Sequence, residues 1–348
     1  MRAVDIFSVM TAAPPEVSVD RAEAVALSEW RIQARAKPLR GERDRNFLLH
    51  ARDGRQFVLK FANPAEQPDF RTMQTEALRH IEQADPSFPV PRVIPLPGGD
   101  FEVSVAGQAG AIHQCRLFSW IEGDLLSTVP RSRVQREACG EMLARLQLAL
   151  QDFHHPASRN PIVWDLQHSS RLREIVFAIP NKPAQERVVE LIDEFEATVR
   201  PMMGHLRSQI VHNDMGVNTI VDSTDPDRVA GVIDFGDIAE TAIIFDVAIA
   251  AAAHLGGDMG AAEAIGYFIK GFHRVRPLLG EEIALLPLLI ALRMGMGLAL
   301  ASWHKHSQPD NPHFDLSETA INRRLAAMAE VRALAANQIL RHVCGSGL

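Results

Sequence analysis

The sequence predicts an α+β protein with two unequal lobes, a small β-rich N-terminal lobe and a larger, mainly helical C-terminal lobe. Two observations predict this fold class. Short apolar runs with turn signals dominate up to about residue 121, and long segments with helical spacing follow Gly123-Asp124. The 348 residues are enough for two packed lobes. The predicted boundaries are 1–118 for the N-terminal lobe with a loose arm at 1–17, 119–123 for a hinge, and 124–348 for the C-terminal lobe.

The N-terminal lobe is predicted to begin with a helix that ends near Trp30. Ser18 and Asp20 are candidate N-caps, and Asp20 with Glu23 has the spacing of a capping box. A hairpin follows, because Asp53-Gly54 separates two short apolar runs. The remaining predicted elements are a helix at about 66–84 and strands at 90–96 and 112–121.

In the C-terminal lobe, long helical segments surround three short strand-like runs that are flanked by polar residues. Asp246 lies inside an apolar helix, where burial of a carboxylate needs a partner, so we expect it to bond a nearby polar loop. The helices are predicted at about 130–153, 185–203, 239–255, 259–273, 281–304 and 317–341, and the strands at 209–212, 219–222 and 229–235.

Composition excludes several classes of protein. The net charge of −7 provides no basic field, so nucleic acid is not an expected partner. Three scattered cysteines form neither a disulfide framework nor a metal-site pattern, which favours a reducing, cytoplasmic environment. The N-terminus lacks the apolar core of a signal peptide, and no run of 18 apolar residues predicts a membrane span. The sequence leaves the oligomeric state open.

Two polar segments carry the residues with chemical potential. The segment IVHNDMGVNTIV at 210–221 holds Asp214 and Asn218, and VIDFGD at 232–237 holds Asp234. Phosphoryl transfer needs a carboxylate that orients and deprotonates the attacking hydroxyl, and oxygen ligands for Mg²⁺. Mg²⁺ prefers one or two carboxylates together with phosphate and water. The two segments therefore indicate a phosphotransferase site.

At these residues the chain resembles the aminoglycoside phosphotransferase and choline kinase superfamily, which has a protein-kinase-like fold, and most closely its hydroxylysine kinase branch. The family pattern H-x-D-x-x-x-x-N aligns with His212, Asp214 and Asn218. The resemblance implies that Asp214 is the catalytic base and that Asp234 and Asn218 hold Mg²⁺, while His212 is expected to be structural. Further matching segments, in family order, are GERDRNF at 41–47, FVLK at 57–60, WDL at 164–166 and VIDFGDI at 232–238.

The chain departs from the family pattern in one place, since three residues separate Asp214 from Asn218 where the family has four. Gly216 could compensate by a tight turn with positive φ, which keeps Asn218 on the metal. Alternatively, Asn218 does not reach the metal, and the protein is a nucleotide-binding pseudokinase.

The resemblance also assigns nucleotide-binding residues in the N-terminal lobe. Lys60 ends the second hairpin strand, where a kinase lysine contacts the α- and β-phosphates, and Glu76 on the next helix is its expected ion-pair partner. No glycine-rich loop precedes Lys60. The resemblance assigns the cover over the phosphates to Arg45 and Asn46, and the contact with the nucleotide base to the backbone near Ser119 and Ile121.

The predicted activity is transfer of the γ-phosphoryl group of ATP or GTP to a small-molecule acceptor. Hydroxylysine is the first candidate by resemblance, within the class of amino alcohols and hydroxylated amino acids. Homoserine, choline and aminoglycosides are the alternatives. Arg293, in an apolar helix, is expected either to face an anionic group of the substrate or to form a buried ion pair. Trp164 is expected to serve packing.

Overall fold

The structure is a computed structural model of the chain. It describes residues 7, 12, 14–41, 43–107, 112–256, 259–307, 316–335, 337–339 and 341. Most of the predicted arm at 1–17 lies outside these residues. The chain forms two compact units, Met1–Glu122 with His155–Ala157, and Gly123–His154 with Ser158–Leu348. The division between Glu122 and Gly123 falls inside the segment 119–123 predicted as a hinge, whereas no sequence pattern indicated that 155–157 belongs to the first unit.

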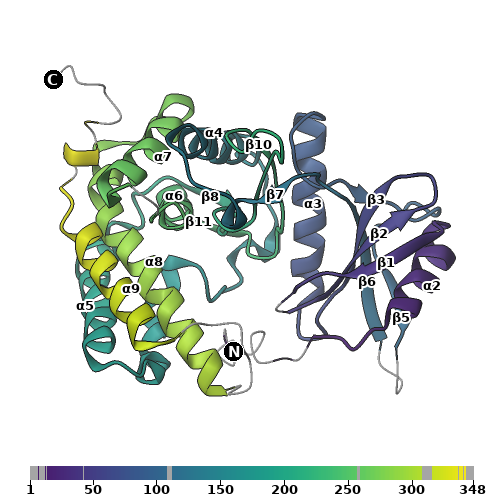
Figure 1. Cartoon of the computed structure of the whole chain (residues 1–348), viewed down its shortest axis with the longest axis horizontal. Coiled ribbons are helices and arrows are strands. Elements are labelled where there is room, and N and C mark those ends of the chain that lie inside the picture. Colours follow the sequence, from purple (N-terminus) through teal and green to yellow (C-terminus); the bar gives the residue numbers. More distant parts are fainter. Residues whose placement is uncertain are drawn as a thin grey trace. The chain divides into compact units, whose positions relative to one another are not determined.

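The first unit is built on an antiparallel sheet with strand order β1-β2-β3-β6-β4, in which β5 also pairs with β6. Helices α2 and α3 lie on opposite sides of this sheet (Figure 1). The elements are α2 (Val19–Trp30), β1 (Ala34–Pro38), β2 (Arg45–Ala51), β3 (Gln56–Phe61), α3 (Pro68–Ala84), β4 (Val93–Ile94), β5 (Val103–Ala106) and β6 (Ile112–Ser119). The predicted Asp53-Gly54 hairpin is confirmed as β2–β3, with Gly54 at φ 87°.

Alternation along the strands places an apolar face of the sheet against α2. Phe47 and Leu49 of β2 and Leu59 of β3 are buried in one cluster with Val25 and Trp30 of α2. This cluster is the core of the first unit, and it leaves the opposite face of the sheet, with Lys60, to α3. The lysine is thus positioned by the period of two in strand β3.

The start of α2 differs from the prediction. Ser18 is the N-cap, since its hydroxyl accepts from the Arg21 N–H at 3.2 Å. Glu23 does not complete a capping box with Asp20, because its carboxylate accepts from the Ala36 N–H of β1 at 3.0 Å. The capping-box prediction is therefore wrong, and Glu23 instead holds the helix to the edge strand.

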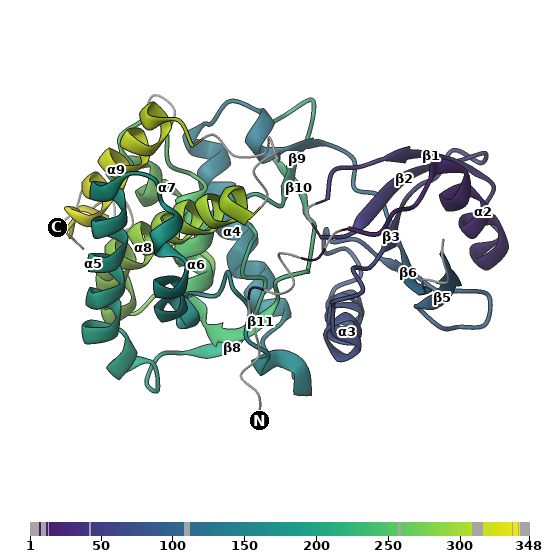
Figure 2. The same ribbon diagram turned by 90° about the horizontal axis from the view of Figure 1, so that it is seen from below.

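The second unit consists mainly of helices around two small antiparallel sheets, β10-β9-β7 and β11-β8. Helices α5, α8 and α9 pack side by side (Figures 1 and 2). The strands are β7 (Asp124–Leu125), β8 (Ser208–Val211), β9 (Thr219–Val221), β10 (Val229–Val232) and β11 (Ala239–Ala242). The α-helices are α4 (Arg133–Ala149), α5 (Lys182–Thr198), α6 (Ile243–Ala252), α7 (Ala261–Val275), α8 (Gly280–Ser307) and α9 (Glu318–Arg332). Between α4 and α5 lie 3₁₀ helices at Pro156–Arg159, Leu166–Glu174 and Val176–Ala178.

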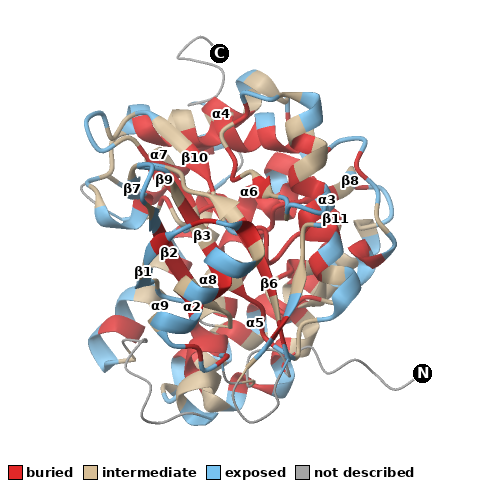
Figure 3. Ribbon diagram, turned by 90° about the vertical axis from the view of Figure 1, so that its right-hand side faces the viewer, coloured by how far each residue is buried: buried red, intermediate tan, exposed pale blue. Residues whose placement is uncertain are grey.

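Two apolar helices form the centre of the second unit. Helix α6 is buried from Ile243 to Ala251 (Figure 3), and it follows β11, although the sequence predicted one continuous helix from residue 239. Helix α8 is long and apolar enough by composition to cross a membrane, but 78% of its most apolar stretch is buried inside the protein. Burial inside the fold accounts for the composition of α8.

Candidate active site

The loop at residues 212–218, called the catalytic loop below, begins where β8 ends. His212 is fully buried, and its Nδ1 accepts from the Asp214 N–H at 3.2 Å. Its Nε2 lies 3.0 Å from the Ile233 carbonyl, and since Nδ1 accepts, Nε2 carries the proton and donates. Burial lowers the pKa of His212, which keeps the ring neutral. The predicted structural role follows, because His212 ties Asp214 to the residue that precedes Asp234.

Asp246 of α6 also holds the catalytic loop through a hydrogen bond. Its Oδ1 accepts from the Asn213 N–H at 2.9 Å, and its Oδ2 accepts from Gln147 Nε2 at 2.8 Å. Asn213 adopts φ 66°, a conformation that asparagine tolerates better than most residues. Burial raises the pKa of Asp246 to about 6. The prediction that Asp246 bonds a polar loop is confirmed.

Asn218, whose spacing departs from the family pattern, contacts the carboxylate of Asp214 directly. Its Nδ2 donates to Asp214 Oδ2 at 2.8 Å and to the Asp214 carbonyl at 3.0 Å. The amide nitrogen therefore faces Asp214, which leaves the Asn218 oxygen as the end that can face a cation. The Asn218 carbonyl also accepts from the Ile233 N–H at 2.9 Å, so the two polar segments are joined here as well.

Gly216 does not adopt the positive φ that the sequence suggested. The glycine is needed for space, because a Cβ there would lie 2.5 Å from Ala253 Cβ and 3.2 Å from the Ala250 carbonyl oxygen. The chain does turn tightly here, because the Asn218 N–H donates to the Met215 carbonyl at 3.0 Å, but the predicted positive φ of Gly216 is wrong. The reason for the glycine is the close approach of the catalytic loop to the end of α6.

Asp234 follows β10 and adopts φ 59°. Its Oδ1 accepts from the Gly236 N–H at 3.1 Å, and the residue is exposed. An exposed carboxylate and the Asn218 amide oxygen are hard oxygen donors of the kind Mg²⁺ takes when phosphates and water supply the other ligands. Among the described residues, no group of three or more His, Cys, Asp or Glu side chains forms a site for a metal held by protein alone. The donor set thus fits a cation that binds together with phosphate.

Arg293 of α8 lies beside the predicted base. Its Nη2 is 3.5 Å from Asp214 Oδ1, and its guanidinium lies over the Trp164 ring at 4.8 Å from the centroid. The side chains of Arg293 and Asp214 are 17% and 18% exposed, so water can reach this ion pair. Trp164 was expected only to pack, but the structure makes it the platform that supports Arg293.

In the first unit, Lys60 forms an ion pair with Asp44, at 2.8 Å from Nζ to Oδ2. The predicted pair with Glu76 is wrong. The Glu76 side chain is 48% exposed, and its carboxylate lies 3.7 Å from His155 Nε2. Helical spacing located α3 correctly, but it did not specify which of the acids near Lys60 would reach the lysine.

Strand register separates the two residues predicted to cover the phosphates. Asn46 of β2 is directly opposite Lys60 of β3, so their side chains share one face of the sheet. Arg45 is opposite Phe61, and its guanidinium lies over the Phe47 ring at 5.1 Å from the centroid. Arg45 therefore lies on the face opposite Lys60, because successive side chains of a strand point to opposite faces, and its place in the cover over the phosphates stays a prediction that this register does not support.

Ser119, in the segment predicted to contact the nucleotide base, already forms hydrogen bonds within the first unit. The Ser119 N–H donates to the Arg92 carbonyl at 2.9 Å, and the Ser119 hydroxyl accepts from the Arg92 N–H at 2.8 Å. This removes the Ser119 amide from the set of groups open to a ligand. A role for the Ile121 backbone stays a prediction.

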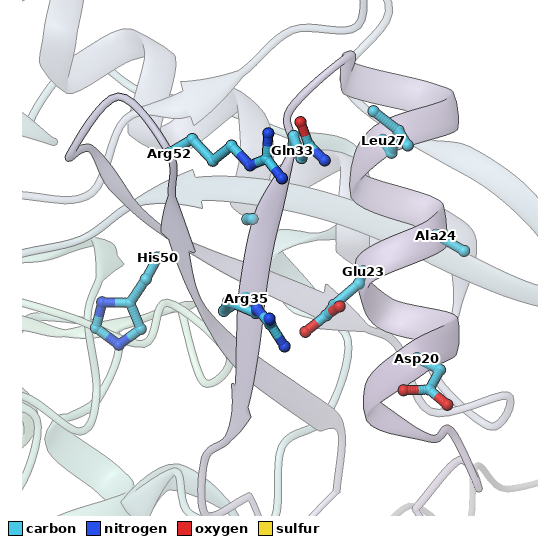
Figure 4. Close-up of a pocket in the computed structure, with 9 residues that line it drawn as sticks. Asp20, Glu23, Ala24, Leu27, Gln33, Arg35, His50 and Arg52 are labelled. Atoms are coloured by element: carbon cyan, nitrogen blue, oxygen red, sulfur yellow. The ribbon is translucent and has the colours of Figure 1, made fainter.

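A hollow of about 650 Å³ lies elsewhere in the first unit, between α2 and strands β1 and β2. Glu23 and Asp20 of the helix and Arg35 and His50 of the strands line it (Figure 4). None of the residues predicted for the site lines this hollow.

The chain belongs to the phosphotransferase enzyme family, whose model matches residues 35–278. It is a phosphotransferase that uses an alcohol group as acceptor, with a protein-kinase-like α+β fold. The chain is 26% identical over 305 residues to hydroxylysine kinase of Mus musculus, which covers 81% of this chain and 80% of that one. The predicted family and fold are confirmed.

Two solved kinases share the fold. A microcompartment-associated aminopropanol kinase is 20% identical with a TM-score of 0.69, covering 94% of this chain and 99% of its own. An amicoumacin kinase, solved in complex with AMP-PNP, Ca²⁺ and Ami, is 15% identical with a TM-score of 0.70, covering 91% and 95%.

Proposed function

We propose that the chain transfers the γ-phosphoryl group of ATP or GTP to the hydroxyl of a hydroxylated amino acid, with hydroxylysine as the first candidate. The phosphotransferase family match and the similarity to hydroxylysine kinase support this class of reaction. One observation carries the choice of acceptor: the cationic side chain of Arg293 lies 3.5 Å from Asp214, the proposed general base.

Asp214 acts as the general base. Its carboxylate takes the proton of the acceptor hydroxyl as the oxygen attacks the γ-phosphorus, and the bond to the β-phosphate oxygen breaks to release the nucleoside diphosphate. Asn218 donates to Asp214 Oδ2, which fixes the carboxylate plane. Mg²⁺, held by Asp234 and the Asn218 oxygen, would neutralise charge on the phosphates.

Arg293 favours an acceptor that carries a carboxylate. Its Nε is buried and has no hydrogen-bond partner within the part of the chain that the structure describes. A guanidinium fixed on Trp164 offers a planar pair of donors, the geometry that binds a carboxylate through two hydrogen bonds. Choline, amino alcohols and aminoglycosides bring positive charge near Arg293 without a carboxylate to offset it, whereas hydroxylysine carries ammonium groups together with a carboxylate that Arg293 could bind.

The pseudokinase alternative rested on the short spacing between Asp214 and Asn218. With that spacing, Asn218 still contacts the catalytic carboxylate at 2.8 Å. No other observation favours a damaged site, and active phosphotransfer is the better supported proposal.

An acceptor panel tests the choice of substrate. Release of ADP or GDP is measured with hydroxylysine, with the hydroxylated diamine that lacks only its carboxylate, and with homoserine, choline and an aminoglycoside. We expect kcat/KM to favour hydroxylysine over the diamine by about 10- to 100-fold, the value of one charge-assisted pair. In Arg293→Gln this preference should disappear. Equal use of the diamine by the wild type would contradict the proposal and favour an amino alcohol acceptor.

A further inference from the structure

The charged residues around Lys60 form a connected cluster in which Asp44 is the direct partner of the lysine. The two side chains are 2.8 Å apart and are 14% and 11% exposed. Asp44 immediately precedes β2, two residues before Asn46, whose side chain shares the face of Lys60. Alternation therefore brings Asp44 to the same face. The geometry points to Asp44 as the residue that positions Lys60 toward the nucleotide phosphates, in place of an acid on α3. This inference rests on the proposed nucleotide-dependent activity.

Asp44 also ties the lysine to its own loop. Its second oxygen, Oδ1, accepts from the Asn63 N–H at 2.8 Å. Asn63 is buried, and its side-chain amide donates to the Arg43 carbonyl at 2.9 Å while its oxygen accepts from the Ala65 N–H at 2.9 Å. The Asp44 carboxylate, which pairs with Lys60, therefore also connects the segment 43–46 to the residues that follow β3.

The charge state of Asp44 suits this role. Burial alone would raise the pKa of Asp44, but the charge of Lys60, its hydrogen bond and the Asn63 amide outweigh burial and lower the pKa. Asp44 is thus ionised near neutral pH, and the half-buried pair is strong enough to restrict the long, flexible side chain of Lys60.

The other acids that the structure describes near Lys60 contact different partners. Glu66, just before α3, accepts from Gln74 Nε2 at 2.8 Å and lies 3.9 Å from the buried Arg116. Burial, followed by the charge of Asp44, raises the pKa of Glu66, which weakens it as a partner for a cation. Glu76 is exposed and approaches His155. Of these three described acids, Asp44 combines a short distance to Lys60 with a lowered pKa.

The experiment is a double-mutant cycle on the full chain. Kd for ATP and GTP with Mg²⁺, and kcat/KM for nucleotide and for acceptor, are measured for the wild type, Asp44→Asn, Lys60→Met and the double variant. We expect Asp44→Asn to lower kcat/KM for the nucleotide by about 10- to 100-fold, the effect of misplacing a positioned group by about 1 Å. KM for the acceptor should stay unchanged. In the Lys60→Met background the same substitution should change kcat/KM by less than about threefold, since Asp44 acts through the lysine.

Three further variants make the outcome decisive. Asp44→Glu should recover part of the loss, while Glu76→Gln and the exposed Asp53→Asn should stay within about twofold of the wild type. The inference is overturned if Asp44→Asn leaves nucleotide kinetics intact, if it tightens nucleotide binding because Asp44 merely competes with phosphate, if the loss persists in Lys60→Met, or if Glu76→Gln shows the loss instead. If the wild type binds neither nucleotide, the proposed function itself is overturned. This outcome is judged from the wild type alone, so it is distinct from a failure of the inference about Asp44.

Discussion

Two buried carboxylates, Asp165 and Asp246, lie close enough behind the catalytic loop to influence each other. Burial raises the pKa of each to about 6, from a usual value of 3.8. The folded state therefore binds these protons more tightly than the unfolded chain does. Their contribution to stability is fully present below about pH 4 and is lost as the pH rises through about 6. Near neutral pH both are charged hydrogen-bond acceptors: Asp246 accepts from Asn213 of the catalytic loop, and Asp165 accepts from Gln167 and from Thr241 of β11.

Replacement of Asp246 with Asn should remove one of these titrations. Relative to Asp246→Asn, the wild type should lose about 1 kcal/mol of unfolding free energy between pH 5 and pH 8, because its buried carboxyl must ionise over that range. Urea unfolding at the two pH values measures this difference. The exposed Asp53→Asn serves as the control, with no pH-dependent difference. A constant gap between Asp246→Asn and the wild type would mean that Asp246 does not titrate there.

At the level of elements, local patterns predicted the hairpin with Lys60, the segments at the ends of β8 and β10, and most helices. They did not predict β11, because its small and apolar residues continue smoothly into the helical pattern of α6. The edge strand β1 was missed because three of its five residues are exposed and two of these are charged. In each case the missing information is the partner strand, which local spacing does not contain.

The same limit applies to the site. Asp214, Asn218 and Asp234 were placed by motif, and the structure brings Asn218 to Asp214. Asp44 was missed although it lies two residues before Asn46, where strand alternation could have indicated the face it shares with Lys60. The choice between Asp44 and Glu76 depends on contacts between segments far apart in the sequence, and spacing along one helix cannot decide it.

The close approach of the catalytic loop to α6 gives an element-level prediction. Gly216→Ala should destabilise the protein by about 1–3 kcal/mol and lower kcat, because the new Cβ would lie 2.5 Å from Ala253 Cβ. Adding Ala253→Gly should restore much of both losses, since it removes the clashing atom. Gly98→Ala is the matched control, because a Cβ there meets nothing within 4 Å. Thermal unfolding and turnover measure the effects; an unchanged Gly216→Ala would refute the packing argument.

Across the whole molecule, each of the two units carries its own polar cluster. The first holds Lys60 on Asp44, and the second holds Asp214 between Asn218 and Arg293. The net charge of −7 offers no general attraction for a nucleotide. In the proposed reaction, local groups such as Lys60 and a bound cation would therefore supply the affinity for the phosphates, and Asp214 would act on the acceptor.

Asp214 is proposed to be the base of a phosphotransferase, and the variant Asp214→Asn tests this role. Nucleotide affinity in the presence of Mg²⁺ should stay within about threefold of the wild type, because the substitution keeps the shape of the side chain. Acceptor-dependent turnover should fall by about 10²–10⁴, the usual contribution of a positioned base. Turnover of Asp214→Asn within about tenfold of the wild type, at unchanged nucleotide affinity, would contradict this mechanism.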